Sequence, residues 1–268
     1  MTAIVTGPAR APLPFGLFSV LPFRTDANDR WLTGVQFETL GEPSTERGVS
    51  FEEVCAPEDL DLSGSGLDLV EAAPFEVYAT YQCSVVGNPL ALAAEVARAR
   101  LEENEERFVE AALATGAFGQ SPNFEDDAET VELADNSVPT LTEAVALLEK
   151  VVGDVYGFQG IFHVSRGTAA LLLEEKLAEK RGQRLYTVLG TPIVAGSGYA
   201  FDGIVATPGF VAYRGEVTVP GNPQSMLNRS DNVLTAVASR PYLLGLDSLP
   251  ILEISFDEAL GETKALTP

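Results

Sequence analysis

The side chain best suited to proton transfer near neutral pH is His163, the only histidine among the 268 residues. It lies in GIFHVS, two positions before Ser165. A serine hydrolase carries its nucleophile on a strand–turn–helix elbow, usually within G-x-S-x-G, and takes its histidine from elsewhere in the chain. Here both residues belong to one predicted strand and G-x-S-x-G does not occur, so we expect His163 to be structural.

Other motifs for catalysis are equally weak. Glycine turns occur at 64–66 (G-S-G) and 196–199 (G-S-G-Y), but neither is a P-loop or a G-x-G-x-x-G dinucleotide fingerprint. The chain contains 39 Asp and Glu residues, so no single pair stands out for acid–base chemistry. We therefore predict no enzyme activity, no catalytic residues and no cofactor.

The sequence patterns for metal binding and for disulfide formation are weak as well. Residues 125–135 are strongly acidic, yet they lack the spacing and the turn glycine of an EF-hand, so no metal site is predicted. The two cysteines, Cys55 and Cys83, fit no zinc pattern and are expected as free thiols, although their spacing leaves contact between them open.

The charge balance excludes several classes of protein. The net charge is −22, and only four lysines are present. A protein that grips nucleic acid needs clustered Lys and Arg to displace counterions. An acidic surface suits either general solubility or a place beside nucleic acid without adhesion. No run of ~18 apolar residues predicts a membrane span, and the first residues do not resemble a signal peptide.

The elements that would position any site are dominated by one long helix. Alternation at Val77, Ala79 and Tyr81 predicts a strand. Asn88 is a suitable N-cap, and Gly116 a suitable stop, which predicts a helix over 88–115 that is ~42 Å long at ~1.5 Å per residue. One narrow apolar stripe is expected on it, with a polar break at Asn104. The charged run 103–107 is expected to be exposed to solvent. The stripe consists of Leu90, Ala94, Ala97, Leu101, Asn104, Phe108 and Ala111.

Before this helix, the sequence predicts an arm and a hairpin. Residues 1–30 are rich in proline and carry Phe15, Phe18 and Phe23, which would be costly to leave in water. Residues 31–41 and 49–55 predict two strands about a turn.

After the helix, the sequence predicts a compact α/β block. The T-x-x-E pattern at Thr140 predicts a capped helix. A strand is expected at 160–165, a helix at 168–180, and short strands from 185 to 219. A late strand pair would hold Pro241 at an edge or bulge. The fold class is therefore α+β.

This order of elements resembles the Hong Kong 97-type fold of tailed-phage major capsid proteins, which encapsulin nanocompartments share. The resemblance rests on local sequences and covers roughly residues 30–256. The N-terminal sequences PFGLFSV and RWLTGVQFE further resemble structural proteins of actinobacterial phages. The remaining sequences are RFVEAALATGAFG (107–119), YGFQGIFHVSRGTAALLL (156–173), LYTVLGTPIVAGSGY (185–199), GIVATPGFVAYRGEVTV (203–219) and NVLTAVASRPYLLGLDSLPILEI (232–254).

The resemblance implies a division of the chain. It consists of an N-terminal arm (1–30), an extended loop (31–75), a peripheral domain (76–137) with a spine helix (88–115), an axial domain (138–212), and return strands with a tail (213–268). The extended loop contains no lysine, so the isopeptide crosslink found in some members of the fold is not expected.

The implied function is a major capsid protein. Hexamers and pentamers would form an icosahedral phage head around double-stranded DNA, which the subunit would meet only by non-specific proximity. The implied partners are other copies, a portal, separate scaffolding and cement proteins. The implied location is the virion, after assembly in the host cytoplasm. An encapsulin shell with cargo and a minor head or tail protein remain alternatives. Subunit contacts are expected at Trp31, Val35, Phe37, Phe15 and Phe18.

Overall fold

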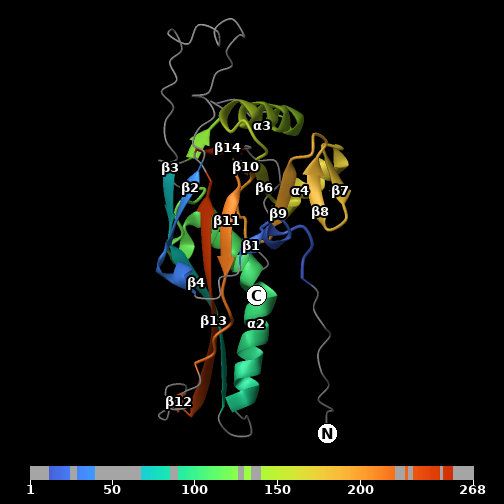
Figure 1. Ribbon diagram of the computed structural model, residues 1–268. Helices are drawn as coiled ribbons and strands as arrows, with labels where there is room; N and C mark the ends of the chain where they lie inside the picture. The colour runs from blue at the N-terminus through green and yellow to red at the C-terminus, as the bar shows by residue number, and fades with distance from the viewer. Residues whose placement is uncertain are drawn as a thin grey trace, which may run out of the picture.

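The computed structural model describes residues 12–24, 29–39, 68–84, 90–125, 130–133, 140–220, 227–228, 232–247 and 250–255. Within these ranges the chain is α+β, as predicted. A narrow sheet runs beside one long helix, and a wider sheet with two shorter helices lies across one end of it (Figure 1). The described helices include none that is both long and apolar enough to cross a membrane.

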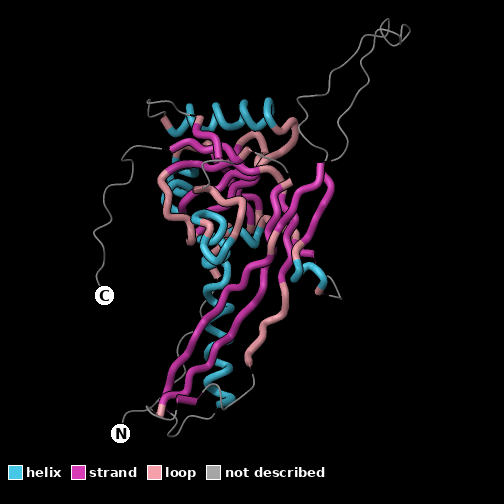
Figure 2. The backbone as a smooth tube through the Cα atoms, turned by 90° about the vertical axis from the view of Figure 1, so that its left-hand side faces the viewer, coloured by secondary structure: helices cyan, strands magenta, loops and turns pink. Residues whose placement is uncertain are grey.

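The narrow sheet is built on two long antiparallel strands. β4 (Pro74–Ser84) pairs with β13 (Val233–Leu246) along its whole length, from Ser84 opposite Val233 to Pro74 opposite Leu243. β11 (Phe210–Arg214) pairs with the other side of β13, and β1 (Phe23–Arg24) pairs in parallel with β11. β12 (Leu227–Asn228) pairs with the start of β13. Figure 2 shows the long strands extending away from the wider sheet, beside the helix.

The long helix is α2 (Leu90–Thr115), which has 26 residues. It ends where predicted, because Gly116 takes a left-handed conformation with φ +69°. The predicted N-cap Asn88 lies outside the described residues. Residues Ala93, Ala97 and Leu101 are fully buried in the core that α2 shares with β4 and β13.

The predicted apolar stripe is right at Ala97 and Leu101, but beyond them Phe108 is only partly buried against the core. The buried row continues four residues after Leu101 at Glu105 and then at Val109, whereas Asn104 is only half-buried.

The expectation of a solvent-exposed middle is right at Glu103 and Arg107, which are exposed, and wrong at Glu105, which is buried. The charge of Glu105 is buried because cationic side chains of the sheet meet it there.

The wider sheet has seven strands in the order β5-β14-β10-β6-β9-β8-β7. Its strands are β5 (Thr130–Glu132), β14 (Ile251–Ser255), β10 (Gly203–Thr207), β6 (Ile161–Ser165), β9 (Pro192–Gly196), β8 (Arg184–Thr187) and β7 (Ala178–Arg181). Two helices pack with it. These are α3 (Leu141–Val155), which begins with the predicted capping box, and α4 (Arg166–Glu174).

Two local predictions differ from the structure. The helix expected over 168–180 ends at Glu174, because Lys176 has φ +60° and so leaves the helical conformation, and the chain continues as β7. Pro241 lies inside β13 rather than at a sheet edge. Its carbonyl accepts from the N–H of Gly215, just past the end of β11. The N–H that proline lacks would point toward Gly215, where the pairing between β11 and β13 has already ended, so no hydrogen bond within that strand pair is lost.

The chain also distributes its late strands differently from the expected division. β13 returns to the narrow sheet, but β14 pairs with β10 in the wider one. β14 is buried on both faces over most of its length, which suits an interior strand of a covered sheet.

A small two-stranded sheet pairs β2 (Val35–Thr39) with β3 (Asp68–Ala72), antiparallel. The strand predicted at 49–55 lies outside the described residues. Short 3-10 turns complete the fold at η1 (Leu17–Ser19), η2 (Arg30–Thr33) and η5 (Ala117–Gly119).

Candidate functional site

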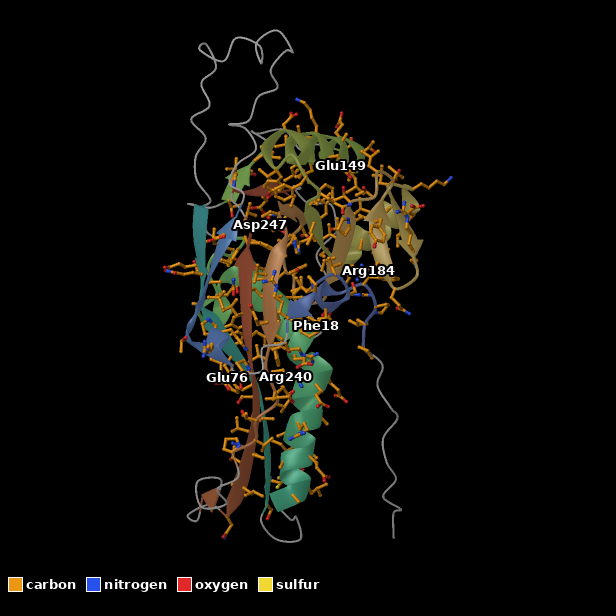
Figure 3. The ribbon with its side chains drawn as sticks, in the orientation of Figure 1. Phe18, Glu76, Glu149, Arg184, Arg240 and Asp247 are labelled. Carbon is orange, nitrogen blue, oxygen red and sulfur yellow. The ribbon has the colours of Figure 1, made fainter. Side chains whose placement is uncertain are left out.

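The best-built polar site of the described chain is a row of three carboxylates on α2. The first is Glu105, which is 4 % exposed. Its oxygens accept hydrogen bonds from Arg214, from Arg240 Nη1 at 2.6 Å and from the Tyr242 hydroxyl at 2.9 Å. Figure 3 marks Arg240 on the long sheet beside the helix. Two cations on one buried carboxylate tie α2 to β11 and β13, and such charge-assisted bonds are stronger than neutral ones.

The next two carboxylates hold the N-terminal segment. Glu106 Oε1 accepts the backbone N–H of Phe18 at 2.7 Å, and Glu110 Oε1 accepts that of Leu17 at 3.1 Å. Both N–H groups belong to η1, which therefore lies against the second half of α2. Burial raises the pKa of both glutamates, and these backbone hydrogen bonds partly oppose that rise.

Glu110 also reaches the wider sheet. Its Oε2 accepts the backbone N–H groups of Ser197 and Gly198, at 2.7 Å and 2.8 Å, in the turn that follows β9. A Cβ at Gly198 would collide with the backbone of α2 at Arg107 and Ala111. Glycine is therefore required for the turn to approach the helix closely enough to bind this carboxylate.

The N-terminal segment is held from its other side as well. The N–H of Ala195 in β9 donates to the carbonyl of Phe15 at 2.8 Å, and Arg166 Nη1 donates to the carbonyl of Pro14 at 3.0 Å. Residues 14–18 thus connect α2, α4 and the wider sheet. The described part of the predicted arm is anchored on its own chain.

The five residues expected in subunit contacts all have partners within the chain. Trp31 is 3 % exposed and stacks on Tyr213 with ring centroids 5.6 Å apart, so it has little surface left for a neighbour. Their part in subunit contacts stays a prediction. Val35 and Phe37 are half-buried around Trp31, and Phe15 and Phe18 pack partly against the two main cores.

His163 is a buried structural residue rather than half of a catalytic pair. Its Nδ1 lies 2.8 Å from the Tyr199 hydroxyl and its Nε2 2.8 Å from Thr207 Oγ1. Burial lowers the pKa of His163 to about 3, so the ring is neutral at pH 7. Ser165 instead caps α4 by accepting the N–H of Thr168.

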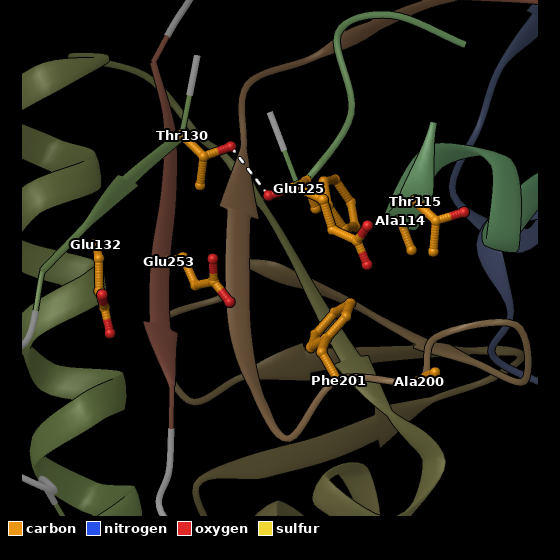
Figure 4. A pocket seen from close by; sticks show the side chains of 9 residues that line it. Ala114, Thr115, Glu125, Thr130, Glu132, Ala200, Phe201 and Glu253 are labelled. Carbon is orange, nitrogen blue, oxygen red and sulfur yellow. Dashed lines mark hydrogen bonds between the residues drawn. The ribbon is translucent and has the colours of Figure 1, made fainter. Parts of the chain in front are cut away.

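A pocket of about 370 Å³ lies where α2 ends beside β5 and β14 (Figure 4). Its lining includes the aromatic rings of Phe124 and Phe201 and the carboxylates of Glu125, Glu132 and Glu253. Burial and the two neighbouring charges raise the pKa of Glu253. No group of His, Cys, Asp and Glu in the described ranges is arranged to hold a metal ion.

The structure describes one of the two cysteines. Cys83 is a half-buried free thiol in β4. Cys55 lies outside the described residues, so contact between the two stays untested.

The residues that the sequence prediction missed are Glu105, Glu106 and Glu110. One sequence signal indicated that Glu105 is buried, because it continues the four-residue spacing of the buried residues Ala97 and Leu101. The arginines that meet it lie more than 100 positions later in the chain. Nothing local identifies that pairing.

The comparisons with known proteins identify the fold. No protein-family model and no curated protein matches the sequence. Among solved structures, the capsid of an empty GTA particle is similar with a TM-score of 0.58 and 12 % identity, covering 96 % of this chain and 94 % of that chain. The holo-SrpI encapsulin complex from Synechococcus elongatus has a TM-score of 0.57 and 14 % identity, with 98 % and 95 % coverage.

A phage protein is equally similar. The structure of Microbacterium phage Oxtober96 has a TM-score of 0.57 and 13 % identity, covering 96 % of both chains. These similarities confirm the predicted Hong Kong 97-type fold, the class shared by phage capsid and encapsulin subunits. At such low identity these similarities establish the fold alone. The function has to be inferred from the properties of this chain.

Proposed function

We propose that this protein is a shell-forming subunit, the major capsid protein of a tailed phage. The observation that carries the proposal is the extent of the structural match, which covers at least 94 % of both chains for the GTA capsid. A match of this extent includes the long helix and both sheets, which is more than a single shared motif. A chain that keeps the whole subunit architecture keeps the shape on which closed assembly depends.

The charge of the chain favours a DNA-filled head. With a net charge of −22, the subunit repels a packaged polyanion, which lets DNA lie close to the wall without adhering. Hexamers and pentamers would enclose the DNA in the virion after assembly in the host cytoplasm. Portal, scaffolding and cement proteins would be separate partners.

An encapsulin-type shell is the second candidate. It is favoured by the holo-SrpI encapsulin, whose fold matches with a TM-score of 0.57 over 98 % of this chain. In that case the shell would enclose a protein cargo in place of DNA.

Electron microscopy of the purified full-length protein tests the shell proposal. We expect closed particles with icosahedral symmetry. A protein that stays monomeric over a range of concentration, salt and pH, with or without scaffolding protein, would refute it. Assembly into open tubes or single rings, in place of closed shells, would instead favour a minor head or tail protein.

The contents of native particles distinguish the two shells. Particles isolated from a lysate should contain nuclease-protected double-stranded DNA if the proposal is right. Particles that contain a stoichiometric second protein and no DNA would identify the encapsulin alternative.

A further inference from the structure

The most exposed large apolar side chains of the described chain are neighbours in the turn between β8 and β9. Leu189 is 77 % exposed and Val188 60 %. The turn is fixed in shape, because the N–H of Gly190 donates to Thr187 at 3.0 Å and Gln159 Nε2 donates to the carbonyl of Gly190 at 2.7 Å. An ordered turn that holds adjacent apolar side chains in water is typical of a contact surface. We call residues 187–191 the apolar turn.

Basic side chains flank this turn. The N–H of Val188 donates to the carbonyl of Leu177, which places the exposed Lys176 at the base of the turn. Arg181 reaches Gly190, since a Cβ there would lie 3.9 Å from its Nη1. Residues 174–184 contain four basic and three acidic residues, a net charge of +1 in a chain that carries −22. The corner of the wider sheet formed by β7, β8 and the apolar turn therefore combines exposed apolar side chains with a small positive net charge, in which Arg181 also pairs with Glu179.

The opposite edge has the complementary character. The pocket beside β5 is lined by Phe124 and Phe201 and by the carboxylates of Glu125, Glu132 and Glu253, and Figure 4 shows Phe201 near these carboxylates. In the described ranges, none of these three carboxylates forms an ion pair. Its volume of about 370 Å³ is ample for a leucine side chain.

We propose that the apolar turn of one copy of this chain docks in the acidic pocket of the next copy. The inference rests on the proposed shell function and names a contact within its rings. Leu189 fills the pocket against Phe124 and Phe201, while Lys176 and Arg181 face its carboxylates. Burying apolar area drives the contact, and the charges set its orientation.

The position of the two surfaces makes the contact directional. The apolar turn joins β8 and β9, whereas the pocket lies beside β5 and β14 on the other side of the same sheet. From β14 to β8 there are four strand spacings of ~4.8 Å, or about 19 Å. Two different patches in contact form a head-to-tail interface, which repeats until the rotation closes a ring. A two-fold dimer would need one patch to meet itself.

Disulfide trapping tests this contact. The variant carries Leu189→Cys and Ala200→Cys, the latter in the pocket lining, with Cys55→Ser and Cys83→Ser to remove the native thiols. Leu189 precedes β9 and Ala200 follows it, and this strand of 5 residues spans ~16 Å. That separation is too long for a disulfide within one chain, so the two new thiols can join only different copies. After air oxidation, non-reducing gels should show a ladder of oligomers that ends at the ring size. Each single-cysteine variant, as a control, should give at most dimers.

A charge exchange gives an independent result. Lys176→Glu and Glu132→Lys, each alone, should raise the concentration needed for assembly by roughly two- to fivefold, and both changes in one chain should restore it. Lys150→Glu, an exposed position on α3, is the matched control and should have no such effect.

The outcomes separate this inference from the function on which it rests. Normal shells without a ladder, or single charge variants that assemble as well as Lys150→Glu, would overturn the docking contact and leave the shell proposal intact. A wild-type chain that never assembles would overturn both.

Discussion

At the scale of single residues, the buried charges of α2 are bound on several sides. Glu105 accepts from two arginines and a tyrosine. Glu110 accepts three backbone N–H groups from two separate segments. Such groups are tolerated in a core because both oxygens of each carboxylate accept hydrogen bonds, and removal of one partner leaves the others uncompensated.

Glu105→Ala should therefore be strongly destabilising. The change leaves Arg240, which is 12 % exposed in its side chain, without its anion. We expect the free energy of unfolding to fall by about 3 kcal/mol, measured by urea denaturation of the unassembled subunit. Glu102→Ala, at an exposed position of the same helix, is the control and should change stability by ~0–1 kcal/mol. Equal effects of the two substitutions would contradict the role given to Glu105.

His163 should add a distinct acid sensitivity. Its folded-state pKa of about 3 lies below the ordinary value of 6.5, so between these values the unfolded chain binds a proton that the folded chain does not. The free energy of unfolding contributed by this residue is thus kept above pH 6.5 and lost toward pH 3, by up to ~1.4 kcal/mol per pH unit.

The comparison with His163→Gln isolates this effect. Glu106, Glu110 and Glu253 have raised pKa values, so their contribution has the opposite sign and grows as the pH falls through their folded pKa values. Those residues are common to both proteins. The difference in stability between wild type and variant should shrink as the pH is lowered from 6.5, and a constant difference would show that His163 does not titrate as described.

At the scale of elements, α2 is held because backbone from two directions approaches it closely. The turn after β9 meets the helix at Gly198, and η1 meets it at Glu106 and Glu110. The helix is long enough to pack on the narrow sheet with one part and to anchor the wider sheet with another. Its connecting role therefore depends on the turn as much as on its own sequence.

Gly198→Ala should disrupt this junction. The added methyl group would collide with the backbone of α2 at Arg107, so the turn must move away and lose its hydrogen bonds to Glu110. We expect a loss of ~1–3 kcal/mol in unfolding free energy, measured by thermal or urea unfolding. Gly209→Ala is the matched control, since a Cβ there has no neighbour within 4 Å and its φ is not in the left-handed range. A loss no larger than that of the control would contradict the close packing.

At the scale of the whole molecule, we expect the proposed shell to be held by non-covalent contacts. Residues 31–75, the predicted extended loop, contain no lysine, so that loop cannot donate an amine to an isopeptide bond. The stability of the shell would then come from apolar burial and complementary charge between subunits.

Assembled particles should accordingly dissociate on boiling in SDS with a reductant. A single band at the size of one chain is expected. Covalent ladders that persist under these conditions would show a crosslink from another lysine and would contradict the prediction. Particles of the cysteine-free variant, run without reductant, control for disulfides.

Much of the architecture could be predicted from the sequence alone. The helix end at Gly116, the capping box at Thr140 and the α+β order follow from local signals, because caps, glycine conformations and alternation act over a few residues. The structural role expected for His163 also followed from its place within a strand. These features needed no knowledge of distant contacts.

Only the tertiary structure decided which charges are buried and which surfaces remain open. The run 103–107 is predicted to be exposed to solvent because an unpaired glutamate is strongly hydrated. Glu105 is nevertheless buried, because Arg214 and Arg240, on strands over 100 residues later in the chain, bind its carboxylate. In the same way, β7 and β5 become opposite edges only through the strand order. The free energy of burying such a residue depends on its long-range partners, and the neighbouring sequence does not show which partners it will meet.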